Sequence, residues 1–164
     1  MRKKLEGEFV NLIDVNQNIL HKICRLYTYD DASHQDLFQE MVIQLWKSYP
    51  SFNGESKFST WMYRIALNTA ITLYRAKKKK VEIIELEDSV LNIKYEEYDA
   101  RKDEQLNHLY RVVRELNDVE KALVYLYLED KCYEEISETL GISEVNARVK
   151  MNRVKNKLKV LINR

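Results

Sequence analysis

The scarcity of glycine and proline constrains the fold of this chain more than any other feature of its sequence. Its 164 residues include three Gly and one Pro, whereas an average composition would supply about twenty. Sandwiches, barrels and hairpin-rich folds need many tight turns, and these two residue types are the commonest turn formers. The composition therefore predicts an all-α chain of long helices joined by few loops.

Apolar residues recur with helical period over seven segments of the chain. The second helix is expected to begin at Ser33, where Ser-His-Gln-Asp has the pattern of a capping box, and to end before Pro50. Asp118 and Ser143 are candidate N-caps, and Gly141 is a candidate C-cap. The seven predicted helices cover residues 8–27, 33–49, 59–76, 106–116, 118–129, 133–140 and 144–162.

Residues 77–103 lose this periodicity and are expected to form a tether with at most short ordered pieces. The predicted architecture is two small helical domains, residues 5–80 and 104–164, joined by an acidic linker at 81–103.

The net charge of +1 conceals a strong segregation of charge along the chain. Residues 1–80 carry +5, residues 81–103 carry −5, residues 104–143 carry −5 and residues 144–164 carry +6. Seven basic residues and no acid lie between Glu55 and Glu82. Clustered Lys and Arg indicate a polyanionic partner, although solvated helix faces would give a similar pattern. Two separate acid-poor segments within helical sequence favour nucleic acid.

The segment 133–150 has the pattern of a helix-turn-helix: a short helix, a turn containing Gly141 and a second helix. In the second helix Ala147, Met151 and Val154 share one face with Leu158 and Leu161. The opposite face then carries Asn146, Val149, Asn152, Arg153 and Asn156, flanked by Arg148, Lys150 and Lys155. Arg can bind guanine and Asn can bind adenine in the major groove. DNA binding is favoured over an ordinary helical hairpin with a solvated basic face.

Little in the sequence indicates an enzyme, a metal-binding protein or a membrane protein. With three glycines the chain has no phosphate-binding loop, and it has no recognisable nucleophile motif or catalytic carboxylate pair. His21 and Cys24 lie one helical turn apart with His34 nearby, but no second ligand pair has suitable spacing, so we expect no metal site and no cofactor. The longest apolar stretch covers residues 122–128, and Glu6 and Glu8 interrupt any signal-peptide core. The two cysteines fit a reduced cytoplasmic protein.

Three segments together resemble the group 4, or extracytoplasmic-function (ECF), sigma factors of the sigma-70 family. Residues 36–46, Asp-Leu-Phe-Gln-Glu-Met-Val-Ile-Gln-Leu-Trp, are similar to the region 2 segment that docks on the polymerase clamp helices. Residues 52–68 are similar to the promoter-melting and −10-reading segment, and residues 104–164 to region 4, which reads the −35 element. The family often has Leu-Pro where this chain has Leu116-Asn117, a change expected to affect only the start of a helix.

The resemblance implies a dissociable promoter-recognition subunit of bacterial RNA polymerase that is not itself an enzyme. Its implied partners are core RNA polymerase, promoter DNA and an anti-sigma factor, with no small-molecule substrate and no membrane insertion. The implied polymerase-binding residues are Asp36, Gln39, Glu40, Gln44 and Lys47. The implied −10 residues are Phe52, Asn53, Ser56, Lys57, Phe58, Trp61, Arg64, Asn68 and Arg75, with Lys77 to Lys80 as further phosphate contacts. The implied −35 residues are Tyr133, Asn146, Arg148, Val149, Lys150, Asn152 and Arg153.

Several alternatives remain open from the residues alone. Phe52 and Phe58 could stack on a flipped base or could fill a core, and Trp61 at such a position is more often part of a core. The acidic face of residues 36–40 could be a solvated helix surface. The whole chain could be a stand-alone helix-turn-helix regulator or a module that only binds polymerase. The basic, aromatic-bearing segment 52–80 favours the sigma factor, because a simple repressor would not need it.

Overall fold

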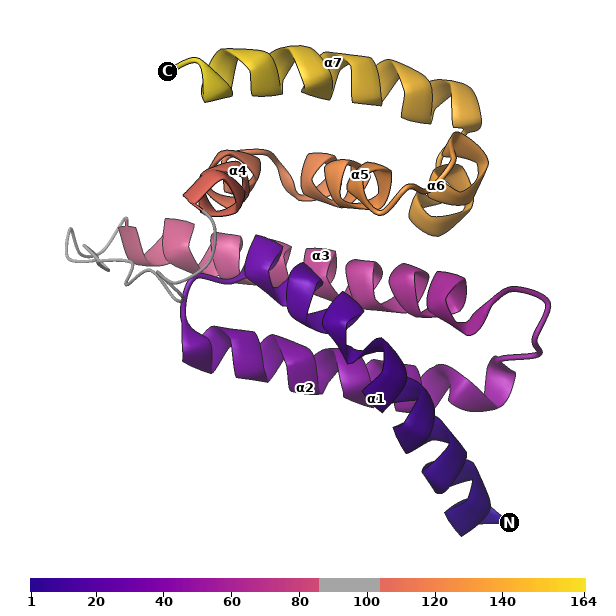
Figure 1. Cartoon of the computed structure of the whole chain (residues 1–164). Helices are drawn as coiled ribbons and strands as arrows, with labels where there is room; N and C mark the ends of the chain where they lie inside the picture. The colour runs from indigo at the N-terminus through magenta and orange to yellow at the C-terminus, as the bar shows by residue number, and fades with distance from the viewer. Residues whose placement is uncertain (86–103) are drawn as a thin grey trace.

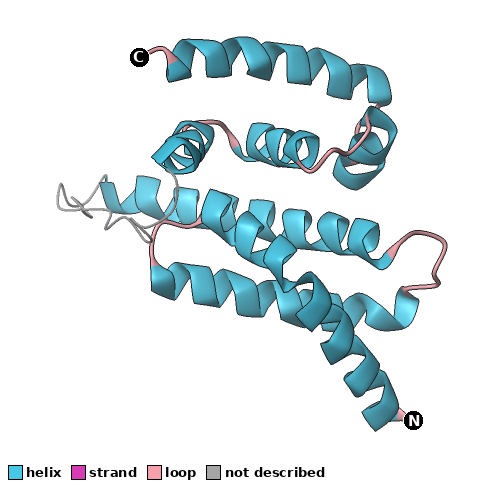
Figure 2. Ribbon diagram, viewed as in Figure 1, coloured by secondary structure: helices cyan, strands magenta, loops and turns pink. Residues whose placement is uncertain are grey.

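The chain is helical throughout the part that the structure describes. The computed structural model describes the backbone of residues 1–85 and 104–164 and the side chains of residues 1–78 and 104–164. Within these ranges it has no strand (Figure 2), which confirms the all-α prediction. The elements are α1 (Arg2–Tyr27), α2 (Asp31–Ser48), η1 (Tyr49–Ser51), α3 (Phe58–Glu85), α4 (Glu104–Arg114), α5 (Asp118–Leu128), α6 (Tyr133–Leu140) and α7 (Glu144–Ile162).

Helices α1, α2 and α3 pack against one another and bury the predicted apolar stripes. Leu20 and Ile23 of α1, Met41 and Leu45 of α2 and Met62 of α3 are fully buried. Full burial of one such side chain stabilises the fold by about 1.5–3 kcal/mol, so these stripes hold the three helices together. The three packed helices therefore hold both ends of the loop between α2 and α3 in place.

The start of α2 differs from the prediction. Asp30, not Ser33, is the N-cap: its carboxylate accepts the backbone N–H of Ser33 at 2.7 Å and the Ser33 hydroxyl at 2.9 Å. The backbone bond, chiefly, lowers the pKa of Asp30. Both residue types cap helices well, and Asp30 is favoured because it lets the helix begin three residues earlier.

The C-terminal half consists of α4 to α7, with α6, a turn and α7 forming the predicted helix-turn-helix. Gly141 ends α6 with φ of +67° and Ser143 caps α7 by accepting the backbone N–H of Asn146, as predicted. The predicted N-cap Asp118 is wrong by one residue. Asn117 caps α5 and forms a reciprocal capping box with Glu120.

Helix α3 runs nine residues past its predicted end at residue 76 and finishes at Glu85. The lysine run therefore continues a helix, which is consistent with the high helix propensity of Lys and the absence of Gly or Pro there. The first five residues of the predicted linker, 81–85, belong to α3, and residues 86–103 lie outside the described part of the chain.

The two groups of helices pack against each other. In Figure 1 the helices α4, α5 and α6 form a layer between α3 and α7, with α1 and α2 on the other side of α3. Polar contacts join the groups: the Tyr27 hydroxyl donates to the backbone carbonyl of Asp118 at 2.6 Å, and Lys22 pairs with Glu129 at 2.7 Å. The buried residues of both groups belong to one hydrophobic cluster.

Candidate nucleic-acid interface

Helix α7 presents the predicted polar face to solvent. Ala147, Met151 and Val154 are buried against α4, α5 and α6, which turns the opposite side of the helix outward. Six of the seven residues predicted to contact the −35 element lie on or beside α7: Asn146, Arg148, Val149, Asn152 and Arg153 are exposed and Lys150 is half-buried. An exposed helix face that carries Asn and Arg side chains can enter a major groove and bind base edges.

Tyr133, the seventh predicted −35 residue, lies at the start of α6 and is half-buried. The Arg148 guanidinium lies 4.6 Å from the centre of its ring, and Arg148 also pairs with Glu144 at 2.7 Å. These contacts hold the Arg148 side chain between α6 and the first turn of α7. The seven predicted −35 residues therefore lie on α7 and at the start of α6, and none of them is among the buried residues of the helix-turn-helix.

The loop between η1 and α3 is short and shaped by two residues. Gly54 has φ of +75°, in the left-handed region that glycine adopts at low cost. The Asn53 side-chain oxygen accepts the backbone N–H of Glu55 at 3.1 Å, which closes a local turn. Asn53, Ser56 and Lys57 are all exposed, so their polar groups are open to a ligand.

The aromatic residues of this loop pack on one another. The Phe52 ring centroid lies 5.7 Å from that of Phe58 and 5.2 Å from that of Trp61, and Tyr49 stacks beside Phe52 at 6.4 Å. We call these four rings, together with Phe9 and Trp46, the aromatic cluster. Phe52, Phe58 and Trp61 are half-buried within it. The packing gives these rings a structural role as the support of the loop.

Sequence reasoning missed Phe9 and Tyr49 as parts of this cluster. Phe9 comes from α1 and lies 5.1 Å from Trp46 and 5.2 Å from Tyr49, ring centre to ring centre. The sequence contained a signal for Tyr49, because this residue directly precedes the helix-breaking Pro50 and continues the apolar face of α2 one turn beyond Trp46. The position of Phe9 depends on how α1 crosses α2, which no local pattern gives.

The outer face of α3 continues from the loop. Arg64, Asn68 and Arg75 are exposed along it, as predicted, and Thr72 lies between them. Arg75 forms an ion pair with Asp118 of α5. At the start of α3 a cavity of about 360 Å³ is lined by Asn53, Glu55, Ser56, Thr60, Trp61, Arg64, Glu138 and Thr139. The last two residues belong to α6, so the C-terminal helices form one wall of a cavity at the loop.

The predicted polymerase-binding residues lie along one side of α2. Asp36, Gln39 and Lys47 are exposed, and Gln44 donates a hydrogen bond to Glu40 at 2.8 Å, with both side chains half-buried. Two cavities of about 220 and 310 Å³ open between α2 and α3, and Glu40 and Leu73 line both. This face therefore combines acidic groups with an apolar groove, a suitable surface for a basic partner helix.

The histidines and Cys24 do not form a metal-binding group. His21 Nδ1 and His34 Nε2 are 2.9 Å apart, and Phe38 stacks on His21. Cys24 is fully buried and burial raises the pKa of its thiol to about 12. Among the residues that the structure describes, no three His, Cys, Asp or Glu side chains come together as metal ligands would.

None of the helices in the described part of the chain is both long enough and apolar enough to cross a membrane.

Comparison with known proteins supports the assignment made from these features. The family model for sigma-70 region 2 matches residues 12–80 and that for sigma-70 region 4 matches residues 106–158. The chain is 32% identical to the ECF RNA polymerase sigma-E factor of Haemophilus influenzae over an alignment of 142 residues, and the match covers 77% of this chain and 75% of the relative. It is 23% identical to the ECF sigma factor SigW of Bacillus subtilis, over 97% of this chain and 91% of SigW.

Solved structures show the same fold. The sigma factor RpoE of Bartonella quintana, in complex with the anti-sigma factor NepR, matches with a TM-score of 0.76 at 16% identity, over 95% of this chain and 97% of that one. CnrH in complex with the cytosolic domain of CnrY matches with a TM-score of 0.68 at 18% identity, over 96% of this chain and 89% of that one.

The two matched regions define a sigma-70-type promoter-recognition protein, and the chain belongs to the ECF sigma factors of that family. Its function is that of a promoter-recognition subunit of RNA polymerase.

Proposed function

We propose that this chain directs transcription initiation in the cytoplasm by reading the −35 element with α7 and the −10 element with the loop at residues 52–57 and the outer face of α3. Core RNA polymerase, which carries the catalytic activity, and promoter DNA are its partners, and an anti-sigma factor is a further one. The observation that carries the proposal is the exposed Asn and Arg face of α7, held outward by the burial of Ala147, Met151 and Val154.

On α7 the base-reading and phosphate-binding roles can be separated. Asn152 and Arg153 are exposed near the middle of the helix and carry the groups that read adenine and guanine. Arg148 and Lys150 flank them and supply charge for phosphates, which fixes the register of the helix on the duplex. Base readout therefore belongs to Asn152 and Arg153.

At the −10 element the exposed polar residues of the loop carry the proposed contacts. Asn53 and Ser56 can bond the edge of an unpaired base, while Lys57, Arg64 and Arg75 bind phosphates of the same strand. A cavity of about 360 Å³ lies beside Asn53 and Trp61, next to these polar groups. The aromatic cluster beneath the loop keeps these groups in place, so Phe52 and Phe58 act on DNA mainly through the loop that they support.

On α2 the exposed Asp36 and Gln39 and the half-buried Glu40 form the proposed docking face for polymerase. The groove beside them, lined by Leu37, Leu73 and Tyr74, adds apolar surface to this acidic face. A partner helix with basic and apolar side chains on one face could pair with the acidic residues and fill the apolar groove.

Run-off transcription with core polymerase tests the proposal. With a library of promoter fragments, the full chain should direct core polymerase to defined start sites, and polymerase alone should give none of these transcripts. A stand-alone regulator would instead bind duplex DNA tightly without polymerase and would add no start site. Sequence-specific duplex binding without any polymerase-dependent transcript would therefore contradict the proposal.

A further inference from the structure

Two valines at the start of α7 are exposed to solvent and do not pack into the fold. Val145 is 73% exposed and Val149 is 43% exposed. Neither is among the described residues that form the hydrophobic cluster or pack against it. Valine is also a poorer helix former than Ala, Glu or Lys, so helix formation does not explain its presence at these positions. Both side chains are therefore available to a partner of α7.

The two valines lie on the line of α7 that is farthest from the core. At 3.6 residues per turn, Val145, Val149, Asn152 and Asn156 fall within about 60° of one another around the helix axis, opposite the buried side of the helix. A helix that enters the major groove turns this line toward the base pairs. In a helix-turn-helix the N-terminal residues of the second helix contact the base edges, and the valines are the N-terminal members of the line.

Charged side chains border the valines on both sides. Arg148 and Arg153 lie about 70° to either side of the line around the helix axis. Glu144, the acidic residue of the first turn, pairs with Arg148 at 2.7 Å. Residues 144–164 include seven basic residues and one acid, and α7 is the outermost layer on its side of the molecule (Figure 1). The valines thus form an apolar strip within a basic surface, which suits a polyanion that presents apolar groups in a groove.

Duplex DNA is such a polyanion, and its apolar group in the major groove is the C5-methyl group of thymine, which apolar side chains recognise by contact. We propose that Val145 and Val149 read thymine methyl groups in the −35 element, in addition to the hydrogen bonds of Asn152 and Arg153. The inference rests on the proposed binding of the −35 element by α7.

The spacing of the valines limits which base pairs they can read. Four residues of helix advance about 6 Å along the axis, whereas successive base pairs are about 3.4 Å apart. The two thymines should therefore lie one or two base-pair steps apart, on the same strand or on opposite strands. In a helix a valine side chain keeps one strongly preferred χ1 rotamer, so the contact costs little conformational entropy.

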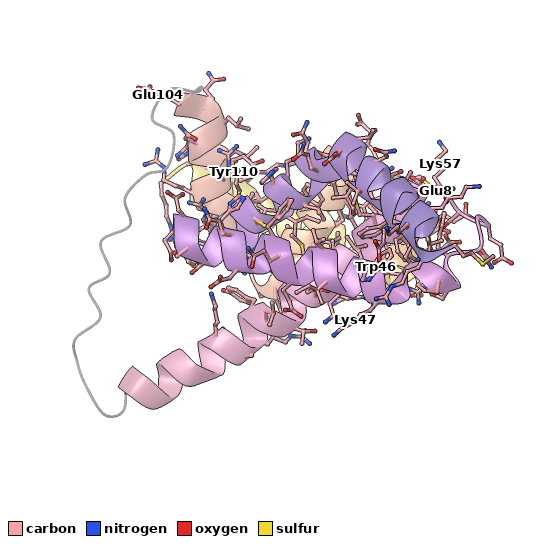
Figure 3. All side chains as sticks on the ribbon, turned by 90° about the horizontal axis from the view of Figure 1, so that it is seen from below. Glu8, Trp46, Lys47, Lys57, Glu104 and Tyr110 are labelled. Atoms are coloured by element: carbon pink, nitrogen blue, oxygen red, sulfur yellow. The ribbon has the colours of Figure 1, made fainter. Side chains whose placement is uncertain are left out.

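The valines are remote from the proposed polymerase-binding face. Figure 3 shows the molecule from below, with α2 and its Lys47 on the near side and α7 behind the other helices. Figure 1 likewise places α2 and α7 on opposite sides of the molecule. Substitution of the valines should therefore leave assembly with polymerase unchanged, and a loss of DNA binding can be assigned to α7.

The first experiment changes the DNA and leaves the protein intact. The holoenzyme, formed from the full chain and core polymerase, is titrated with a duplex promoter fragment selected by run-off transcription. Each thymine of the −35 element is replaced in turn by deoxyuridine, which lacks the methyl group and keeps the hydrogen bonds of the base pair. We expect binding to weaken about four-fold at each of two thymines, the value of one buried methyl group. Unchanged binding at every replacement, or an element without thymine on either strand, would overturn the proposal.

The second experiment assigns each methyl group to one valine. Val145→Ala and Val149→Ala should each weaken binding of the unmodified fragment and should each abolish the effect of deoxyuridine at one position only. Both variants should fold, because the side chains are exposed and Ala favours a helix more than Val does. Val15→Ala, at an 82% exposed position of α1, is the matched control and should bind as the wild type does. Deoxyuridine effects that persist in both valine variants would mean that other residues read the methyl groups, which contradicts the assignment.

A contact with another protein is the competing role for the two valines. In that case the variants would weaken co-purification of core polymerase, and deoxyuridine would have no effect on the binding of the promoter fragment. That outcome would also overturn the proposal.

Failure of the −35 assignment as a whole gives a different result. If Lys150→Ala and Arg153→Ala both bind the fragment as the wild type does, α7 does not hold the −35 element, and the thymine inference fails with the proposed function. If these two variants weaken binding and deoxyuridine has no effect, the −35 assignment stands and only the thymine inference is wrong.

Discussion

At the scale of single residues, the structure of the loop between η1 and α3 separates two roles, reading a base and supporting the loop. The sequence alone could not assign these roles to individual residues. Phe52 contacts Tyr49, Phe58 and Trp61 inside the aromatic cluster, whereas Asn53 is exposed and uses its side-chain oxygen only for a bond to Glu55. A base-reading role suits Asn53, because its amide nitrogen is free to donate. A supporting role suits Phe52, because its ring is already half-buried.

Substitution of these two residues should therefore give different defects. Asn53→Ala should keep the thermal midpoint close to that of the wild type and should impair promoter opening, read by permanganate reactivity of unpaired thymines. A template already unpaired at −10 should restore transcription. Phe52→Ala should lose about 2–4 kcal/mol of stability, because it removes a large ring from the cluster. Normal promoter opening by the Asn53→Ala variant would contradict the base-reading role and leave Asn53 with only its local role in the turn.

At the scale of elements, α7 is the best test of base readout, because its two faces are cleanly separated. Arg153→Ala should lose discrimination at one or two base positions of the −35 element, about 1–3 kcal/mol, if Arg153 binds a base edge. Lys150→Ala should weaken binding to all sequences alike and lower the salt dependence, as loss of a phosphate contact does. Binding titrations of each variant against a set of −35 duplexes at two salt concentrations measure both effects. Uniform losses for both variants would mean that α7 does not read bases.

Helix α2 offers a second test at this scale. Asp36→Arg/Glu40→Arg reverses the charge of the proposed docking face and should weaken assembly with core polymerase. The N-terminal fold should survive, because Asp36 is exposed and Glu40 half-buried. Asp14→Arg/Glu8→Arg, on exposed positions of α1, is the matched control. Co-purification of core polymerase with the α2 variant at the wild-type yield would contradict the docking assignment.

The same scale shows why helices were easier to predict than their ends. Periodicity indicated all seven helices, because most of them bury one apolar stripe; α5, in which residues 121–126 are all buried, is the exception. The ends depend on competition between neighbouring groups: Asp30 against Ser33, and Asn117 against Asp118. The continuation of α3 to Glu85 was missed because a lysine run has no apolar stripe, although it has high helix propensity.

At the scale of the whole molecule, the sequence could not give the packing of the two groups. The two residues in each contact that joins the groups, such as Tyr27 with Asp118 and Lys22 with Glu129, are about a hundred positions apart in the sequence. No local pattern in the sequence indicates such a pair. The predicted site residues were found on the expected faces, but the acidic wall at Glu138 and the buried Lys121 depend on that packing. The segregation of charge was visible in the sequence, but the packing of the acidic segment 104–143 against α3 appears only in the structure.

The buried Lys121 makes the packing of the two groups depend on pH. Burial, chiefly, and the charge of Arg114 lower its pKa from 10.5 to about 8, with Asp118 acting in the opposite direction and Lys78 in the same one. Tyr27 of α1 and Tyr74 of α3 face the ammonium. Because the pKa of Lys121 is lower in the folded chain than in the unfolded chain, folding releases a proton between pH 8 and 10.5. The stability of the packed chain should therefore rise as the pH rises from about 8 toward 10.5, and below pH 8 the cost of burying the charged ammonium is fully present.

Lys121→Met should remove this dependence and stabilise the folded chain by about 1–3 kcal/mol, since a shift from 10.5 to about 8 corresponds to about 3.4 kcal/mol at most and the lost cation–π contact offsets part of it. Denaturant unfolding between pH 7 and 9 measures the change, and the difference between wild type and Lys121→Met at each pH removes the contribution of the tyrosines, whose ordinary pKa is about 10. The control is Lys131→Met, whose ammonium lies 5.1 Å from the centre of the Tyr63 ring but is only half-buried, so it should alter stability little. A wild-type stability that does not rise relative to that of Lys121→Met between pH 8 and 9 would mean that Lys121 is hydrated in solution.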